Sequence, residues 1–355
     1  MEICFVLPRY VLHPIGGYKI VYEYANRLSQ NPNYKVKILF LNKTALANKK
    51  LPVFIKNKLI NHFTKCGPNW FKLDKKVERI SLTQNNGLKK IKNVDKVIAT
   101  AATTVESVYE LFPNADKYYL IQDFENWDIS TQELYQTYNY PNFVNITVSK
   151  WLKDVVQKHS INPTYYVQNP LNVEEYRVKN PIEKRPKYMI GMLYHKASYK
   201  GTRYSLNAIK ILKKKYPDLK VKMFGAYARP TNLPEWIEYT QNASKEETID
   251  IYNSISVFIN GSVKEGFGLT GLEAMACGAT LVSTDYLGVK EYAINNKNAL
   301  LSPVKDVNAL VKNTSILLQD DKKRIALAYK GVETAQKYSW KNAYNSLIKI
   351  LSLNK

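Results

Sequence analysis

Cysteine, histidine and long apolar runs are scarce in this chain of 355 residues. The three cysteines, Cys4, Cys66 and Cys277, are odd in number and far apart, which fits neither a disulfide framework nor a CxxC metal site. A reducing compartment is therefore expected. The sequence begins with no basic segment followed by an apolar one, and no apolar run approaches the ~20 residues that span a bilayer. We expect a cytoplasmic protein. Any association with the inner face of the cell membrane is expected to be peripheral, through the protein surface.

Metal-binding patterns and low-complexity tracts are also missing. The four histidines, at positions 13, 62, 159 and 195, have no ligand spacing, and no Asp-x-Asp occurs. We therefore expect no metal and no other cofactor. No internal repeat interrupts the sequence, and its hydrophobic content is 45%. That length and composition predict two ordered α/β domains.

Positive charge is abundant and unevenly distributed. Lysine and arginine number 52 against 30 acidic residues, a net charge of +22, and residues 43–96 hold fourteen basic against three acidic residues. Within this segment two helical faces can be distinguished: Ile55, Leu59 and Phe63 on one, and Lys58, Asn61 and Lys65 on the other. Such a segment suits an anionic membrane surface or an anionic polymer. A solvated helix in a protein of biased composition explains it equally well.

The first half of the chain alternates between apolar strands and longer segments. Residues 3–7 read as a strand, Gly16-Gly17 as a glycine loop, and the following segment as a helix. The further strands expected are residues 36–41, 96–100, 118–122 and 143–148. This alternation predicts a mostly parallel sheet with helices on both faces.

A second alternating series follows a polar, proline-containing stretch at residues 171–187, which we interpret as a linker. The fold class predicted is α/β, with a doubly wound, Rossmann-like domain at 1–170 and another at 188–338. Residues 339–355 are expected to form a closing helix that packs back toward the first domain. Such sheets bind ligands at the carboxyl ends of their strands, so two facing domains predict a cleft between them.

The stretch from Glu265 to Glu273 carries the most chemical information. It follows an apolar strand at 257–260, and its glycines at 266, 268 and 271 let the backbone approach a ligand. A helix beginning near Thr270 points its first amides at the same place, which favours a bound anion. The two glutamates flanking this loop can accept hydrogen bonds from hydroxyls, which sugars and riboses supply. The alternative is a turn followed by a helix-start carboxylate.

The run from Glu265 through Gly278, with Val282 to Asp285 and Glu291 after it, resembles the donor-binding signature of the fourth family of retaining glycosyltransferases. The resemblance extends less sharply over nearly the whole chain, and a bacterial rhamnosyltransferase-like branch is the nearest part of the family. It implies the two-domain GT-B architecture and a metal-independent hexosyltransferase. The implied reaction moves a sugar from a nucleoside-diphosphate sugar to a hydroxyl of a glycan, glycopolymer or glycoconjugate, with retained configuration.

The resemblance also assigns roles to residues. Lys200, followed by Gly201, matches the donor-phosphate lysine, while the family's arginine five positions earlier is here His195, beside Lys196. Lys196 then supplies the second cation, or Lys200 and the helix amides hold the pyrophosphate. Glu265 positions the donor sugar and Glu273 the ribose. The complete donor set implied is Gly16, Gly17, His195, Lys196, Lys200, Gly201, Glu265, Gly266, Phe267, Gly268, Leu269, Thr270 and Glu273.

Two acidic residues, Asp123 and Glu125, follow the expected strand at 118–122. They are candidates for acceptor binding, and Asp123 is also a candidate for catalytic assistance beside Lys200 and Glu265. A solvated loop or a helix cap is the alternative. The acceptor is expected to be a glycan or glycopolymer, either free or linked to a lipid. An acceptor of this kind indicates a role in polysaccharide biosynthesis.

Three alternatives remain, one of which is an epimerase or phosphorylase of the same architecture. A sugar-nucleotide-binding subunit without catalysis fits the missing arginine. A nucleic-acid-binding protein fits the charge and the 27 tyrosines, but the sequence has no RNP-like motif, zinc knuckle or basic dimerisation helix. No nucleic-acid partner is therefore expected.

Overall fold

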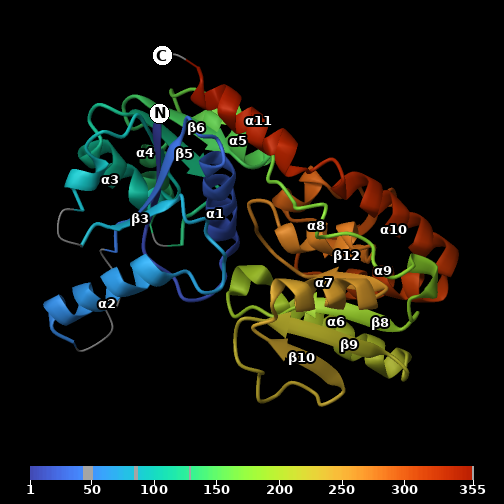
Figure 1. Ribbon diagram of the computed structural model, residues 1–355. Coiled ribbons are helices and arrows are strands. Elements are labelled where there is room, and N and C mark those ends of the chain that lie inside the picture. The colour runs from blue at the N-terminus through green and yellow to red at the C-terminus, as the bar shows by residue number, and fades with distance from the viewer. Residues whose placement is uncertain (43–50, 84–86, 128, 354–355) are drawn as a thin grey trace. The chain divides into compact units, whose positions relative to one another are not determined.

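The computed structural model describes residues 1–42, 51–83, 87–127 and 129–353, and the chain divides into two compact units (Figure 1). Unit 1 comprises Met1–Gln168 with Tyr344–Lys355, and unit 2 comprises Asn169–Ala343. Each unit contains one sheet of parallel strands with its own buried core. The predicted α/β class with two doubly wound domains is confirmed.

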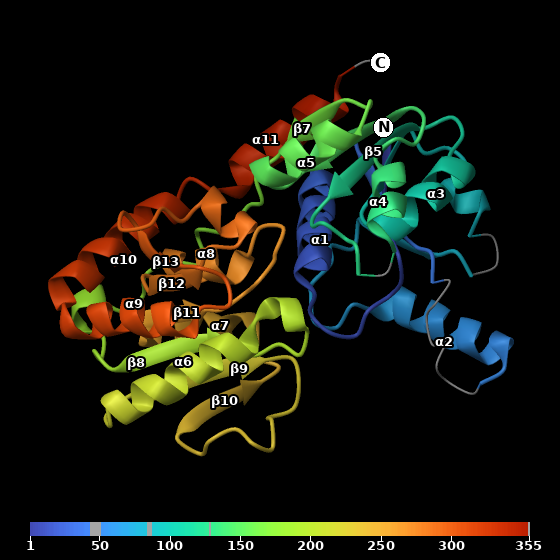
Figure 2. The same cartoon turned by 180° about the vertical axis from the view of Figure 1, so that it is seen from behind.

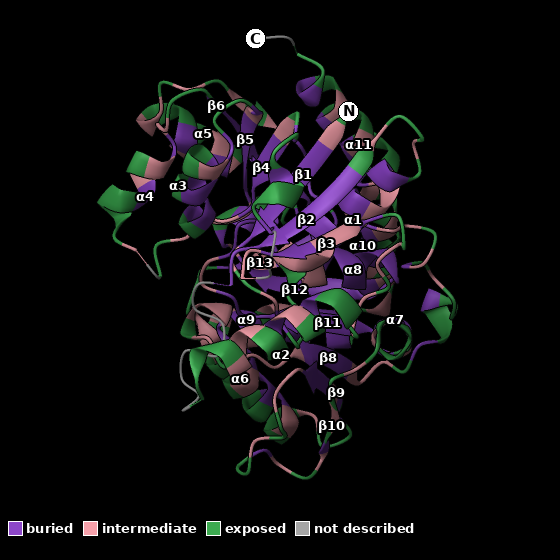
Figure 3. Cartoon of the chain, turned by 60° about the vertical axis from the view of Figure 1, so that its left-hand side comes forward, coloured by how far each residue is buried: buried purple, intermediate pink, exposed green. Residues whose placement is uncertain are grey.

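The sheet of unit 1 has the strand order β3-β2-β1-β4-β5-β6-β7. Its strands are β1 (Glu2–Leu7), β2 (Lys35–Phe40), β3 (Glu78–Ser81), β4 (Lys96–Ala99), β5 (Asp116–Ile121), β6 (Phe143–Thr147) and β7 (Thr164–Tyr166). The central strands are apolar along almost their whole length, as parallel strands covered on both faces must be. Figure 3 shows most strands of the chain in the colour of buried residues.

The helices of unit 1 are α1 (Gly16–Ser29), α2 (Val53–Cys66), α3 (Ala102–Leu111), α4 (Thr131–Thr137) and α5 (Lys150–His159), with a 3₁₀ turn at Lys89–Ile91. Helix α1 buries Ile20, Tyr24 and Leu28, a stripe with a spacing of four residues. Helix α4 begins with a reciprocal capping box between Ser130 and Glu133. It packs beside α3, as the view from behind shows (Figure 2).

The sheet of unit 2 has the strand order β10-β9-β8-β11-β12-β13. Its strands are β8 (Met189–Leu193), β9 (Lys220–Gly225), β10 (Ile237–Gln241), β11 (Val257–Asn260), β12 (Thr280–Thr284) and β13 (Ala299–Ser302). Its helices are α6 (Thr202–Lys215), α7 (Lys245–Ser254), α8 (Leu269–Ala276), α9 (Val307–Gln319) and α10 (Asp321–Ala335). The 3₁₀ turns lie at Ile182–Lys184, Ser198–Lys200 and Leu287–Glu291.

The strand order of unit 2 reverses its direction between β8 and β11. From β8 the chain passes through α6 to β9 on one side, and from β11 it passes through α8 to β12 on the other. Because parallel crossovers are right-handed, α6 and α8 cover opposite faces of the sheet. The loops after β8 and β11 leave the same sheet edge in opposite directions, which is where doubly wound folds bind ligands.

The expected linker at 171–187 differs from what is observed, since these residues group with unit 2. One reason is Arg185, a buried side chain that donates to backbone carbonyls of unit 2, including that of Cys277 at 2.5 Å. Asn253 also accepts from the Lys179 N–H at 2.7 Å. Helix α11 (Trp340–Leu351) closes the chain, and residues 344–355 group with unit 1. No helix among the described residues is long and apolar enough to cross a bilayer.

Candidate functional site

The loops after β8 and β11 meet at the reversal point of the unit 2 sheet. Gly201, between Lys200 and α6, has a φ of +59°. A Cβ built on it would lie 1.8 Å from the carbonyl oxygen of Gly261, just after β11. The left-handed conformation favours glycine, and only a residue without a Cβ allows this close approach. The Lys200-Gly201 pair singled out from the sequence thus brings the two loops together.

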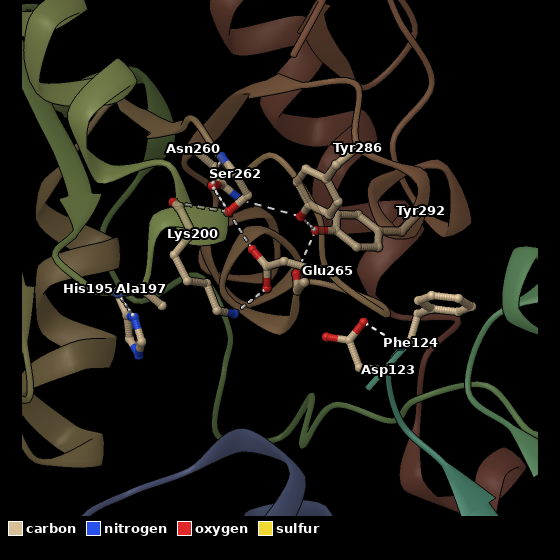
Figure 4. A network of polar contacts seen from close by, with 11 residues as sticks. Asp123, Phe124, His195, Ala197, Lys200, Asn260, Ser262, Glu265, Tyr286 and Tyr292 are labelled. Atoms are coloured by element: carbon tan, nitrogen blue, oxygen red, sulfur yellow. Dashed lines mark hydrogen bonds and ion pairs between the residues drawn. The ribbon is translucent and has the colours of Figure 1, made fainter. Parts of the chain in front are cut away.

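The side chains of Lys200 and Glu265 form an ion pair across these loops, with Nζ 2.6 Å from Oε2 (Figure 4). The Glu265 side chain is 8% exposed and that of Lys200 is 25% exposed. The other carboxylate oxygen of Glu265 lies 2.5 Å from the hydroxyl of Ser262. Ser262 is held in turn by Asn260, whose Oδ1 accepts from the Ser262 backbone N–H at 3.0 Å. The direction of the Glu265 carboxylate is therefore fixed by two donors, Lys200 and Ser262.

Helix α8 begins directly after this pair. Its N-cap, Gly268, has a φ of +87°, and no side chain caps the helix among the described residues. The amides of the first turn and the helix dipole favour an anion at this end. Glu273, in the second turn, is buried, and its Oε2 accepts from the Tyr252 hydroxyl at 3.2 Å. The loop between Glu265 and Glu273 therefore lies between the ammonium of Lys200 and the N-terminus of α8.

Two tyrosines support the backbone of this loop from behind. The Tyr292 hydroxyl donates to the carbonyl of Gly268 at 2.6 Å and lies 3.2 Å from the hydroxyl of Tyr286. Thr284, at the end of β12, donates to the carbonyl of Ser262. Ser262, Tyr286 and Tyr292 were not predicted from the sequence. Ser262 follows a strand three residues before Glu265, which is a usable signal, whereas the tyrosines have no spacing that distinguishes them among 27.

His195 and Lys196 follow β8, and their contacts test whether either can supply the positive charge predicted for it. His195 Nδ1 accepts a hydrogen bond from the Ala197 N–H at 3.0 Å, so this nitrogen carries no proton. Burial, and then the charge of Lys200, lower the pKa of His195, while Glu265 opposes the shift. Lys196 lies over the ring of Tyr227, with Nζ 5.0 Å from its centroid. Neutral His195 does not supply the charge of the missing arginine.

The remaining predicted donor-binding residues of unit 2 are of two kinds: some offer backbone groups to a ligand, and one has a side chain buried in the core. Gly266 and Gly268 are buried, and Leu269 and Thr270 begin α8. Phe267 is 3% exposed and packs its ring against Tyr292 and Tyr338, at centroid distances of 5.3 and 5.8 Å. Its side chain therefore holds the loop in place, and any ligand contact it makes comes from its backbone.

The predicted residues of unit 1 lie at the carboxyl edge of its own sheet. Gly16 and Gly17 form the first turn of α1, and a Cβ on Gly17 would lie 3.1 Å from the side chain of Gln122, just after β5. Asp123 accepts from the Phe124 N–H at 2.8 Å. Glu125 accepts from the Ala102 N–H at 2.7 Å and so caps the start of α3. The structure thus joins the glycine pair to the end of β5 and gives Glu125 a structural contact.

Metal ligands do not gather in the described part of the chain. No group of three or more His, Cys, Asp or Glu side chains with a geometry for a metal ion occurs among these residues. The ammonium of Lys200, in its pair with Glu265, places a cationic group at the loop that leads into α8.

Comparisons with known proteins point in one direction. The family model described as glycosyl transferases group 1 matches residues 172–334. The D-inositol 3-phosphate glycosyltransferase of Corynebacterium urealyticum is 29% identical over 178 residues, which cover 46% of this chain and only 42% of that protein. The residues matched by the family model include Lys200, Glu265 and Glu273 of unit 2.

Solved structures resemble the whole chain at low identity. The sucrose-phosphate synthase of Thermosynechococcus elongatus superposes with a TM-score of 0.75 at 15% identity, covering 99% of this chain and 98% of the other. HepE of Anabaena, solved in complex with UDP-glucose, gives a TM-score of 0.74 at 14% identity and covers 99% of both chains. At this identity the likeness establishes the fold, which is that of the two-domain GT-B enzymes.

Proposed function

We propose that the chain is a group 1 glycosyl transferase and that it transfers a sugar from a nucleoside-diphosphate sugar to a hydroxyl of a glycan or glycopolymer, with retained configuration. The observation that carries this proposal is the ion pair between Lys200 and Glu265, 2.6 Å long, at the loop that leads into α8. HepE, which shares the fold, was solved with UDP-glucose, which supports this class of donor.

The leaving group explains why a lysine and a helix start belong together here. As the bond between the anomeric carbon and the phosphate oxygen breaks, the diphosphate gains negative charge. Preorganised donors aimed at that charge stabilise the transition state more than the ground state. The ammonium of Lys200 has three N–H donors, so it can bind a phosphate oxygen while keeping Glu265. The amides of the first turn of α8 supply the second set of donors.

The carboxylates then hold the neutral parts of the donor. Glu265 has two oxygens with about four acceptor positions, of which Lys200 and Ser262 occupy two. The rest accept hydrogen bonds from the donor sugar hydroxyls. Glu273, whose Oε2 is steadied by Tyr252, accepts from the ribose.

Transfer with retention needs no protein nucleophile in this scheme. The acceptor oxygen bonds to the anomeric carbon on the face that the phosphate leaves, and the acceptor proton passes to the departing phosphate oxygen. Asp123 is proposed to orient the acceptor hydroxyl. Since Lys200 and the α8 amides supply the positive charge, we expect activity to persist in EDTA.

The basic α2 helix suggests where the acceptor is met, namely on an anionic lipid surface. Helix α2 contains no acidic residue, and Val53 and Phe54 at its start are 71% and 72% exposed. Leu59 and Phe63, from the apolar face predicted from the sequence, are also exposed, whereas Ile60 is buried. Residues 43–50 and 84–86 of the basic segment lie outside the described residues. A lipid-linked or membrane-proximal glycan acceptor at the inner face of the membrane fits this helix.

The donor site is tested with Lys200→Met and Glu265→Gln. UDP, GDP and dTDP are first compared by thermal shift, because a ligand that binds only the folded state raises its apparent stability. The corresponding sugar nucleotides then serve as donors, and release of nucleoside diphosphate is measured with and without EDTA. Loss of one preorganised cation should lower kcat/KM by roughly 10²- to 10³-fold in Lys200→Met. Glu265→Gln should lower it at least about tenfold, through loss of a charged acceptor.

Lys210→Met is the matched control, since Lys210 is an exposed lysine of α6 in the same unit. It removes the same charge at a distance from the loop and should retain wild-type turnover. Equal activity in Lys200→Met and Lys210→Met would remove the assignment of Lys200. A wild-type protein that binds none of the three diphosphates would overturn the proposed function itself.

A further inference from the structure

A chain of hydrogen bonds runs from the end of β11 to the start of α8 through two buried tyrosines. Asn260 Nδ2 donates to the Tyr286 hydroxyl at 3.3 Å, the hydroxyls of Tyr286 and Tyr292 lie 3.2 Å apart, and Tyr292 donates to the Gly268 carbonyl at 2.6 Å (Figure 4). Each phenol has one proton, and the amide end can only donate. The chain therefore has a single direction, in which every hydroxyl donates toward Gly268.

The same asparagine also reaches the ion pair. Asn260 Oδ1 accepts from the Ser262 N–H, and the Ser262 hydroxyl lies 2.5 Å from Glu265. One buried side chain thus connects the glutamate of the Lys200 pair with the tyrosines that hold the helix start. Burial raises the pKa of both Tyr286 and Tyr292, so both phenols keep their protons near neutral pH.

The glycines of the loop are fitted to these hydroxyls. A Cβ on Gly268 would lie 2.0 Å from the Tyr286 hydroxyl, and one on Gly271 would lie 2.4 Å from the Tyr292 hydroxyl. Tyr286 and Tyr292 are 1% and 2% exposed. The two phenols occupy the space behind the loop and approach its backbone as closely as a glycine permits. A mere filling of the core would not require a hydroxyl aimed at the carbonyl of the N-cap residue.

We propose that Tyr292, supported by Tyr286, is a positioning residue that orients the peptide between Gly268 and Leu269 for the distal phosphate of the donor. In a trans peptide the carbonyl and the following N–H point in opposite directions. The bond from Tyr292 draws the Gly268 carbonyl inward, and the Leu269 N–H consequently points away from the tyrosines. This inference rests on the proposed function, because it assigns the Leu269 amide to a nucleoside diphosphate.

The consequence is a selective effect on the distal phosphate. Without the Tyr292 hydroxyl, the Gly268 carbonyl loses a 2.6 Å hydrogen bond and keeps the longer one from the Gly271 N–H, 3.2 Å, so the peptide is held less firmly. An amide that must be reoriented on binding contributes less to affinity than a preorganised one. The ribose, base and proximal phosphate do not depend on this peptide. Affinity for a nucleoside diphosphate should therefore fall more than affinity for the monophosphate.

The test compares Tyr292→Phe with Tyr338→Phe. Both changes remove one largely buried hydroxyl that donates to a backbone carbonyl, but Tyr338 donates to Glu291 and not to Gly268. Binding of UDP and UMP is measured by calorimetry for both variants and for the wild type. Tyr292→Phe should weaken UDP about tenfold, the value of one hydrogen bond, and change UMP less than about twofold. Tyr338→Phe should leave the ratio of the two affinities at its wild-type value.

The UDP to UMP ratio separates a positioning role from general destabilisation. Loss of both ligands in equal proportion, or an unchanged affinity for UDP in Tyr292→Phe, overturns the positioning role. GDP with GMP, or dTDP with dTMP, replaces the uridine pair if the thermal-shift screen selects another base. If the wild type binds no diphosphate, the proposed function fails instead, so the two failures can be told apart.

Discussion

The imidazole of His195 lies between two opposite influences in the candidate site. Burial and the charge of Lys200 lower its pKa, and Glu265 acts in the other direction. Its Nδ1 already accepts a hydrogen bond from Ala197, which protonation would break. His195 is therefore neutral at pH 7, and the Lys200 charge is part of the reason.

We predict that Lys200→Met raises the pKa of His195, whereas Lys210→Met does not change it. NMR titration of the His195 ring proton measures both. The unfolded chain, with a histidine pKa near 6.5, binds more protons than the folded one below that value. The contribution of His195 to stability is thus complete above about pH 6.5 and declines as the pH falls toward the lower folded pKa. A His195 pKa above 6.5 in the wild type would contradict this account.

At the same scale, sequence patterns could identify some residues of the site and not others. Glu265, Glu273 and Lys200 belong to a recognisable spacing of acids, glycines and a lysine, and the structure brings Lys200 to Glu265. Tyr286 and Tyr292 could not be found, because what distinguishes them is a tertiary contact with Gly268. Their side chains are ordinary core residues in any linear pattern.

Among the elements, the segment before β8 is held to unit 2 by buried polar side chains, of which Arg185 is one and Asn253 another. Arg185 donates to the carbonyls of Tyr252, Ile255 and Cys277, and it also bonds Asn180. It thereby joins the entry to β8 with the ends of α7 and α8. Burial lowers its pKa to about 10, so it stays charged at neutral pH. The planar guanidinium can reach several carbonyls at once, which a lysine cannot do.

Arg185→Met should lower the free energy of unfolding of unit 2 by about 3 kcal/mol, because several buried carbonyls lose their donor. Arg185→Lys should recover only part of this loss. The exposed Arg177→Met serves as the control and should change stability by less than about 0.5 kcal/mol. Amide hydrogen exchange in β11 and β12, read against urea concentration, measures the effect within unit 2. Equal protection in the Arg185 and Arg177 variants would refute the role.

The elements themselves were partly predictable. The apolar strands β1, β2, β4, β5 and β6 were expected to within two residues of their observed bounds, because buried parallel strands are continuous apolar runs. Strands β3, β7, β10 and β13 were missed. They are three to five residues long, and β10 is Ile-Glu-Tyr-Thr-Gln, in which hydrogen bonds to β9 outweigh a weak apolar signal. The polar composition of 171–187 likewise concealed Arg185, since burial of an arginine cannot be inferred from its neighbours.

For the whole molecule, the net charge of +22 is the property that the fold does not explain. Unit 1 and unit 2 each have a core, and neither needs the excess of lysine for packing. The anionic sugar nucleotide that we propose as the donor accounts for Lys200 but not for the basic segment. A negatively charged membrane surface attracts nearby lysines with about 1 kcal/mol each, over a distance that salt shortens. Helix α2 combines such lysines with four exposed apolar side chains, those of Val53, Phe54, Leu59 and Phe63.

We therefore predict that the protein binds vesicles containing phosphatidylglycerol at low salt and is released as salt is added. Lys56→Glu with Lys58→Glu should weaken binding at least about tenfold, since two attractive charges become repulsive. Phe54→Ser should also weaken binding, at all salt concentrations, because insertion of an exposed phenyl ring contributes roughly 1.5–3 kcal/mol. Vesicle flotation measures both variants.

The control variants carry the same types of substitution at exposed residues outside α2. Lys312→Glu with Lys322→Glu reverses two exposed lysines of unit 2, and Ile161→Ser removes an apolar side chain that is 91% exposed outside α2. If net charge alone drives binding, the two lysine pairs will weaken it equally. If α2 is the docking element, only the substitutions in α2 will weaken vesicle binding. Phe54→Ser will then also lower the vesicle binding that persists at high salt. Equal flotation of the Phe54 and Ile161 variants would therefore exclude α2 as the lipid contact.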